Sequence, residues 1–136
     1  MIVIDTHALI WFMQGDETLG PDSRQLVIER AASEVVLVSA MTFWEAALLA
    51  QRGRIDLGED SLRWSRRVLA TPGFAIAPIE PEIATDAVAL RWGHKDPADR
   101  MIVATARHWR VPLLTVDRAI TGYAGLGHLT VIDASR

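Results

Sequence analysis

The stretch that decides the fold is MIVIDTHALI, residues 1–10, in which a short apolar run stops at Asp5 and a helical pattern begins directly after it. The run is too short for a typical helix and is rich in branched side chains, which is typical of a buried strand. Similar runs recur along the chain, at residues 35–38, 74–79, 111–116 and 129–132. Together these segments predict about five strands that are covered on both faces.

Helical patterns fill the intervals between these runs, and several of them end at glycine or proline. The predicted helices cover residues 6–14, 21–32, 41–52, 61–69, 82–92 and 97–109. This alternation predicts an α/β fold with a central parallel sheet of about five strands flanked by helices on both faces. No linker, repeat or low-complexity segment is present, so residues 1–136 are predicted to form one domain. The glycine-rich stretch 122–127 is interpreted as a flexible connection, because it precedes a strand and lacks the glycine order of a dinucleotide-binding loop.

The composition excludes several classes of protein. Half of the residues are hydrophobic and 23% are charged, which is the balance of a globular domain and not of a disordered chain. The absence of cysteine excludes disulfides, thiolate metal sites and a cysteine nucleophile. A net charge of −3 argues against a general nucleic-acid coat. No apolar run approaches the roughly 18 residues that span a bilayer, so we expect a cytoplasmic protein without membrane contact.

Two aspartates follow predicted strands directly. Asp5 ends the first apolar run and Asp117 ends the fourth. In an open parallel sheet the carboxyl ends of the strands meet at one edge, and ligands bind there, near the point where the strand order reverses. The alternative interpretation of each residue is helix capping, because aspartate accepts hydrogen bonds from the first N–H groups of a helix.

Two further acids lie within helical patterns. Glu45 shares a helix face with apolar side chains, where a carboxylate is desolvated unless something compensates it. Asp96 is predicted to cap the helix that begins at Pro97, and is therefore assigned a structural or peripheral role. Asp99 shares the buried face of that helix with Ile102, so capping explains it only in part.

If these acids converge, they form a site for a cation. Two like charges about 4 Å apart repel by ~4 kcal/mol at an effective dielectric constant near 20, so such a cluster takes up protons or binds a positive ion. Ligands that are all oxygen suit Mg²⁺ or Mn²⁺. An ion of this kind can bridge a phosphodiester and lower the pKa of a bound water. The residues alone therefore indicate metal-dependent phosphoryl chemistry at Asp5, Glu45, Asp99 and Asp117.

Four segments, in this order and spacing, resemble the PIN-domain family. They are IDTHALIW at residues 4–11, Ser39 with FWE at 43–45, DPADRMIVATA at 96–106 and LTVD at 114–117. Each motif alone is weak, but the ordered set is specific and covers nearly the whole chain. Within the family, the sequence is most similar to VapC-type toxins of type II toxin–antitoxin modules.

The resemblance implies a Mg²⁺- or Mn²⁺-dependent endoribonuclease. An ion-activated water would attack the phosphorus in line and leave a 5′-phosphate and a 3′-hydroxyl. The family's acidic positions map onto Asp5, Glu45, Asp99 and Asp117, which would hold the metal, with Glu45 ligating it or orienting the water. Three further residues would lie next to these acids and orient them without holding the metal, namely Thr6, Thr115 and Asp96.

The resemblance also implies partners. These are an RNA substrate, with tRNA among the options, a cognate VapB-type antitoxin whose arm crosses the acidic cleft, and a second copy of the chain in a homodimer. Arginines near the acids are predicted to contact phosphate, namely Arg52, Arg100 and Arg118. The alternative for each of them is ordinary surface solvation.

Two other functions remain open at this point. One is a metal-independent ribonuclease that uses histidines as acid and base, drawn from His7, His94, His108 and His128, and leaves a cyclic phosphate. The other is a non-catalytic PIN-like module that binds RNA or protein. Cleavage in the presence of a chelator would favour the first, and a lack of cleavage would favour the second.

Overall fold

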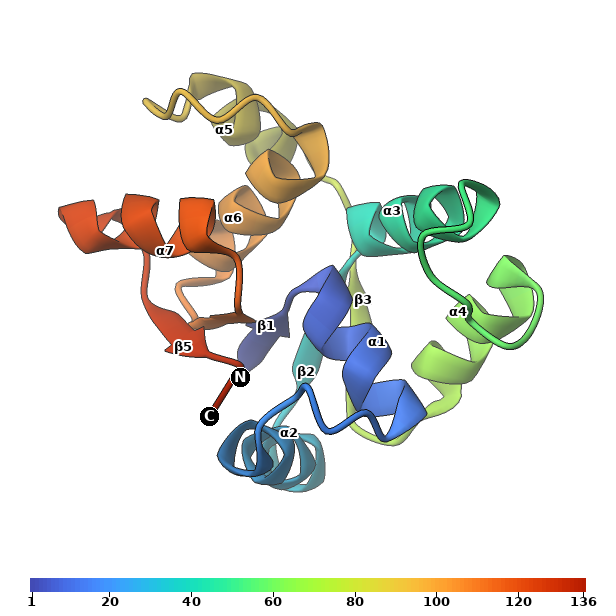
Figure 1. Ribbon diagram of the computed structural model, residues 1–136. Coiled ribbons are helices and arrows are strands. Elements are labelled where there is room, and N and C mark those ends of the chain that lie inside the picture. The colour runs from blue at the N-terminus through green and yellow to red at the C-terminus, as the bar shows by residue number, and fades with distance from the viewer.

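The computed structural model describes residues 1–136 and contains one five-stranded sheet in the order β3-β2-β1-β4-β5, with every neighbouring pair parallel (Figure 1). The strands are β1 (Ile2–Ile4), β2 (Val36–Ser39), β3 (Phe74–Ala77), β4 (Leu113–Thr115) and β5 (Val131–Asp133). Each lies within or beside one of the apolar runs, so the predicted parallel α/β sheet is confirmed. The alternation within the runs explains why both faces are buried: Ile2 and Ile4 point to one side of the sheet and Val3 to the other.

The chain forms seven helices, and six of them cover the two faces of the sheet. They are α1 (Thr6–Gln14), α2 (Pro21–Ser33), α3 (Ala40–Gln51), α4 (Ser61–Ala70), α5 (Pro81–Ala89), α6 (Pro97–Trp109) and α7 (Arg118–Tyr123). One core joins the first four helices to the face that carries Ile2 and Ile4, and it includes the fully buried Trp64. A second core joins α6 and α7 to the face that carries Val3 and Leu37. Helix α5 packs on the outside of α6 rather than on the sheet (Figure 1).

Oxygen-bearing side chains cap the helices that follow three of the strands. Asp5 accepts a hydrogen bond from the backbone N–H of Thr6, Ser39 accepts one from Met41, and Asp117 accepts one from Ile120. Asp5 and Asp117 therefore cap helices, as the alternative interpretation of these residues predicts. Capping also fixes these two carboxylates at the carboxyl edge of the sheet.

Two sequence predictions need correction. Residues 122–127 are not an irregular connection: helix α7 continues into a single π-type turn, η1 (Ala124–His128), in which only Gly127 leaves the helical conformation, with a φ of 86°. Tyr123 explains this order, because its ring is nearly buried and is stacked between the rings of Trp92 and His128. The second correction concerns α5, which ends at Ala89 rather than near residue 92. Strand ends also shift by one or two residues, as for β5, which begins at Val131 rather than at residue 129.

None of the helices is long and apolar enough to cross a membrane.

Candidate active site

The reversal of strand order lies between β1 and β4. Strands β2 and β3 extend the sheet on one side of β1, whereas β4 and β5 extend it on the other. Because the crossovers leave in opposite directions, the carboxyl ends of β1 and β4 border a crevice. Asp5 and Asp117 stand at these ends, since Asp5 follows Ile4 and Asp117 lies two residues beyond Thr115.

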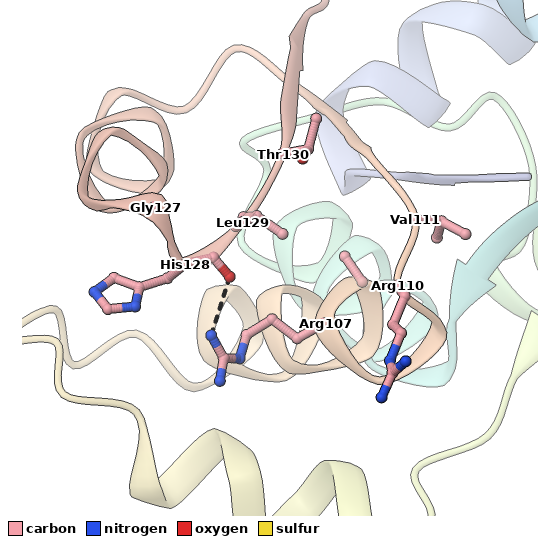
Figure 2. A pocket seen from close by; sticks show the side chains of 8 residues that line it. Arg107, Arg110, Val111, Gly127, His128, Leu129 and Thr130 are labelled. Atoms are coloured by element: carbon pink, nitrogen blue, oxygen red, sulfur yellow. Dashed lines mark hydrogen bonds between the residues drawn. The ribbon is translucent and has the colours of Figure 1, made fainter.

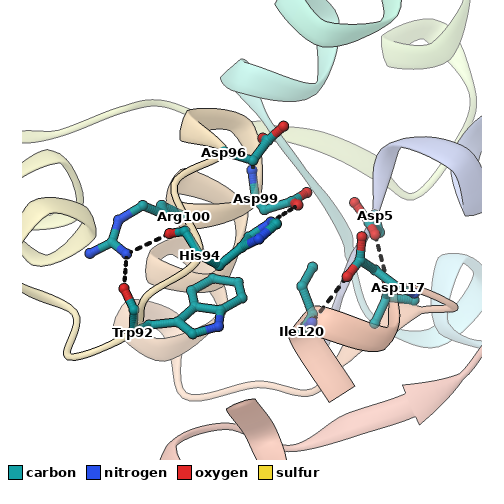
Figure 3. A network of polar contacts seen from close by, with 9 residues as sticks. Asp5, Trp92, His94, Asp96, Asp99, Arg100, Asp117 and Ile120 are labelled. Atoms are coloured by element: carbon teal, nitrogen blue, oxygen red, sulfur yellow. Dashed lines mark hydrogen bonds and ion pairs between the residues drawn. The ribbon is translucent and has the colours of Figure 1, made fainter. Parts of the chain in front are cut away.

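The four predicted acids line one cavity of about 210 Å³. Its lining residues are Asp5, His7, Glu45, Asp96, Asp99, Val116 and Asp117. They come from the ends of β1 and β4, from α3 and from the first turn of α6. No lysine or arginine lines it. The structure thus brings together carboxylates that are far apart in the sequence, and Figure 3 shows Asp5, Asp96, Asp99 and Asp117 facing a common space.

Asp5 is the most deeply buried of these acids, with 6% of its surface exposed. One carboxylate oxygen accepts the N–H of Thr6 at 2.8 Å, and the other accepts the hydroxyl of Thr115 at 2.5 Å. Burial raises the pKa of Asp5, and the negative charge of Asp117 adds to this, while the two hydrogen bonds oppose it. Thr115 also accepts the N–H of Asp117 at 3.0 Å, so it connects the first and the last acid.

Glu45 reaches the cavity from α3. Burial raises its pKa, and the charges of Asp5 and Asp96 raise it further, whereas a hydrogen bond from Thr6 lowers it. The hydroxyls of Thr6 and Thr42 lie 3.2 Å apart in the core, one turn of α3 before Glu45. Thr6 thus lies behind the acids as expected, and Thr42 is a buried partner that the sequence pattern did not single out.

Asp99 is largely buried on the inner side of α6. Burial raises the pKa of its carboxyl to about 7, with the charges of Asp5 and Asp96 adding to the effect, while a hydrogen bond with His94 opposes it. The His94 Nε2 atom lies 2.6 Å from Asp99 Oδ2. The sequence predicts only a possible acid–base role for His94, and no spacing rule predicts its contact with Asp99.

Asp96 lies close to two of the acids that are predicted to hold the metal. It caps α6 as predicted, accepting the N–H of Asp99 at 3.0 Å. One carboxylate oxygen each of Glu45, Asp96 and Asp99 also lie within 4.8 Å of one another. Carboxylate oxygens at this separation, with no lysine or arginine among the lining side chains, are a donor set that fits a divalent ion such as Mg²⁺ or Mn²⁺. The residues present therefore fit the metal that the sequence predicts.

The structure corrects the prediction for Arg100. Its guanidinium turns away from the acids and donates hydrogen bonds to five backbone carbonyls, which leaves no N–H group for phosphate. Arg52 is exposed at the end of α3, and Arg118 begins α7. Their predicted contacts with RNA stay predictions.

The histidines do not form one group. His7 lines the acidic cavity and His94 contacts Asp99. His108 lies on the last turn of α6 beside Trp109. His128 lines a second cavity of about 560 Å³ together with Arg107 and Arg110 (Figure 2). His7 and His94 therefore lie beside the acidic cavity, whereas His108 and His128 lie elsewhere.

Comparison with known proteins shows the family. The model of the PIN domain matches residues 2–126. The chain belongs to this family. It is 34% identical over 128 residues to Ribonuclease VapC22 of Mycobacterium tuberculosis, an alignment that covers 90% of this chain and 91% of that protein.

Solved structures of toxin–antitoxin complexes share the fold. A chain of a toxin–antitoxin complex from Klebsiella pneumoniae superposes with a TM-score of 0.64 at 25% identity, covering 98% of each chain. A chain of VapBC2 from Rickettsia felis, bound to a DNA fragment from its promoter, gives a TM-score of 0.68 at 15% identity, covering 97% of this chain and 98% of that one. At 15% identity the second likeness concerns the fold alone.

Proposed function

We propose that this protein is a metal-dependent endoribonuclease, the toxin of a toxin–antitoxin pair. The observation that carries the proposal is the acidic cavity at the carboxyl ends of β1 and β4, where largely buried carboxylates gather without a lysine or an arginine in the lining. The similarity to Ribonuclease VapC22 over nine-tenths of the chain supports RNA as the substrate. A fold alone hosts many functions, so the donor set has the greater weight.

In this proposal Asp5, Asp99 and Asp117 hold the ion, and Glu45 ligates it or orients the attacking water. The bound ion supplies positive charge that polarises the phosphodiester and lowers the pKa of water. Thr115 fixes the rotamer of Asp5 through its 2.5 Å hydrogen bond. Asp5 and Asp99 are largely buried, and electrostatic interactions are stronger there than in bulk water.

The proposed partners follow from the same site. An arginine of an antitoxin arm would satisfy paired carboxylates with two parallel hydrogen bonds and compete with the metal. The toxin–antitoxin complexes among the similar structures support such a partner. A homodimer and a tRNA substrate stay predictions.

The experiment that tests the proposal is cleavage of RNA by purified, antitoxin-free protein with Mg²⁺, Mn²⁺ or EDTA, followed by sequencing of the RNA ends. We expect cleavage only with metal, and ends that carry a 5′-phosphate and a 3′-hydroxyl. Cleavage that survives EDTA and leaves cyclic phosphates would establish the histidine mechanism instead. Binding of RNA without cleavage under any metal would indicate a non-catalytic module.

A further inference from the structure

Arg100 has more internal hydrogen bonds than any other side chain in the molecule. It follows Asp99 on α6, and its guanidinium folds back over the connection from α5 to α6 (Figure 3). Its Nε and both Nη atoms contact five carbonyl oxygens at 2.7–3.2 Å, those of Ala87, Val88, Leu90, Trp92 and His94. All five N–H donors of the guanidinium are therefore used.

These carbonyls belong to a segment that has few backbone partners of its own. Ala87 and Val88 lie in the last turn of α5, whose carbonyls lack intrahelical donors. Beyond the helix, the connection keeps two backbone hydrogen bonds, from the N–H of Leu90 to Asp86 and from the N–H of Trp92 to Leu90. The guanidinium thus takes the place of the missing backbone donors and holds the connection in one conformation.

Aromatic rings hold the same connection from its other side. The Trp92 ring lies 4.8 Å from the Tyr123 ring in a stacked arrangement, and 4.7 Å from the His94 ring. With the backbone fixed by Arg100 and the rings fixed by Tyr123, the His94 imidazole is directed at the Asp99 carboxylate, 2.6 Å away. Asp99 in turn faces the acidic cavity.

We propose that Arg100 is a positioning residue that acts on the metal-binding carboxylate of Asp99 through His94. The inference rests on the proposed function, because it concerns the orientation of a proposed ligand. Arg100 does not touch substrate in this proposal. It sets the geometry in which His94 restrains Asp99, and such restraints on metal ligands affect metal affinity and rate by about 10–100-fold.

The sequence predicts a different role for Arg100, a contact with phosphate, and that role has different consequences. It requires the guanidinium to leave several carbonyls, and it acts on the binding of RNA rather than on the metal. Removing a phosphate contact raises KM and lowers the salt dependence of binding. Removing a positioning residue lowers kcat and metal affinity and leaves KM almost unchanged.

The test compares Arg100→Lys with Arg66→Lys, a matched change at an exposed arginine of α4. Lysine keeps the charge, but its ammonium offers three donors from one point and cannot reach five carbonyls. For Arg100→Lys we expect Mn²⁺ affinity and kcat each to fall about 10-fold, with KM and the salt dependence unchanged. In the metal-free protein, ¹H–¹⁵N spectra of the His94 ring should change in Arg100→Lys and stay unchanged in Arg66→Lys.

A second comparison guards against simple misfolding. If Arg100 acts through His94, the double variant Arg100→Lys with His94→Ala should bind Mn²⁺ no more weakly than His94→Ala alone. Additive losses would overturn the proposal, as would an unchanged His94 spectrum in Arg100→Lys. So would a raised KM with a reduced salt slope, which would restore the phosphate contact. If the wild-type protein cleaves no RNA, the proposed function fails, while Mn²⁺ binding and the His94 spectra still decide the role of Arg100.

Discussion

The two ends of α6 carry opposite charges, and each end borders a different cavity. At the first turn, Asp96 and Asp99 border a cavity of about 210 Å³ with no lysine or arginine in its lining. At the last turn, Arg107 and Arg110 border a cavity of about 560 Å³ with no acidic residue in its lining (Figure 2). Both charge patterns agree with the helix dipole, which favours acids at the start of a helix and bases at its end.

The difference lies in how the charges are satisfied. Arg107 forms an ion pair with Asp86 and donates a hydrogen bond to the carbonyl of His128, as Figure 2 shows for the latter. Arg110 is exposed to solvent. The buried acids at the other end have no lysine or arginine beside them, and burial raises the pKa values of Asp5, Glu45 and Asp99. Buried carboxylates with raised pKa values, rather than the size of a cavity, therefore distinguish the candidate active site.

Removing one acid should produce the largest effect. Asp5→Asn keeps the cap on Thr6 but loses a charged ligand, so we expect cleavage to fall by about 1,000-fold or more in a folded protein. The metal-free variant should melt at the same or a higher temperature, because one repulsive charge is gone. Cleavage of RNA and thermal melting measure this, with Asp22→Asn, an exposed aspartate on α2, as control. Full activity in Asp5→Asn would remove this residue from the mechanism.

Loss of the support behind Asp5 should have an intermediate effect. Thr115→Val keeps the shape of a side chain that is 1% exposed but deletes its hydrogen bond to Asp5. We expect cleavage to fall by about 10–100-fold. Thr105→Val is the matched control, because that buried hydroxyl bonds only to the carbonyl of Met101 in its own helix. Equal losses of activity in the two variants would show that burial alone explains the effect.

The buried acids should make the metal-free protein less stable as the pH rises. The pKa of Asp99 is raised to about 7, so between about pH 5 and pH 7.5 the folded protein loses a proton that the unfolded chain has already lost. We expect the melting temperature to fall over this range by a few degrees, with burial of Asp5 and Glu45 acting in the same direction.

Two controls sharpen this pH dependence. Asp99→Asn should flatten it, and Mg²⁺ should raise the melting temperature most at the higher pH, where the acids are charged. The exposed acids with lowered pKa values, Asp16, Glu34 and Asp133, act below this range. A melting temperature that rises from pH 5 to pH 7.5 in the wild-type protein would contradict the prediction.

A change at the basic end of α6 should have the smallest effect. Arg110 ends the helix with a positive φ of 55°, a conformation that strains a side chain by ~1–2 kcal/mol. Arg110→Gly should raise the free energy of unfolding by up to about 1 kcal/mol, since this relief exceeds the added entropy of the unfolded chain. Urea denaturation measures it, and Arg110→Ala should show no gain. Lost cleavage in Arg110→Gly would show that the basic cavity serves the reaction.

The sequence predicts the acids well because each one breaks a local pattern. Asp5 and Asp117 end apolar runs, and Glu45 interrupts an apolar helix face, so period and position were enough. Arg100 and His94 break no such pattern. Their contacts depend on how the α5–α6 connection turns, and that turn depends on the Tyr123 stack from another part of the chain. The same long-range stack holds Tyr123 at the end of α7. The glycine content of residues 122–127 carries no information about this stack, and so it predicts a flexible connection there.

The order in which the acids occur along the chain has a consequence for synthesis. Asp5 is made first and Asp117 last, and β4, which leads to Asp117, completes the sheet beside β1. A partial chain that ends before β4 contains only one side of the crevice, the end of β1, and lacks the other side, the end of β4. A nascent polypeptide on the ribosome therefore has no finished catalytic centre, even though the ribosome itself is rich in RNA. If the protein cleaves RNA as proposed, cleavage therefore requires that β4 has first docked beside β1.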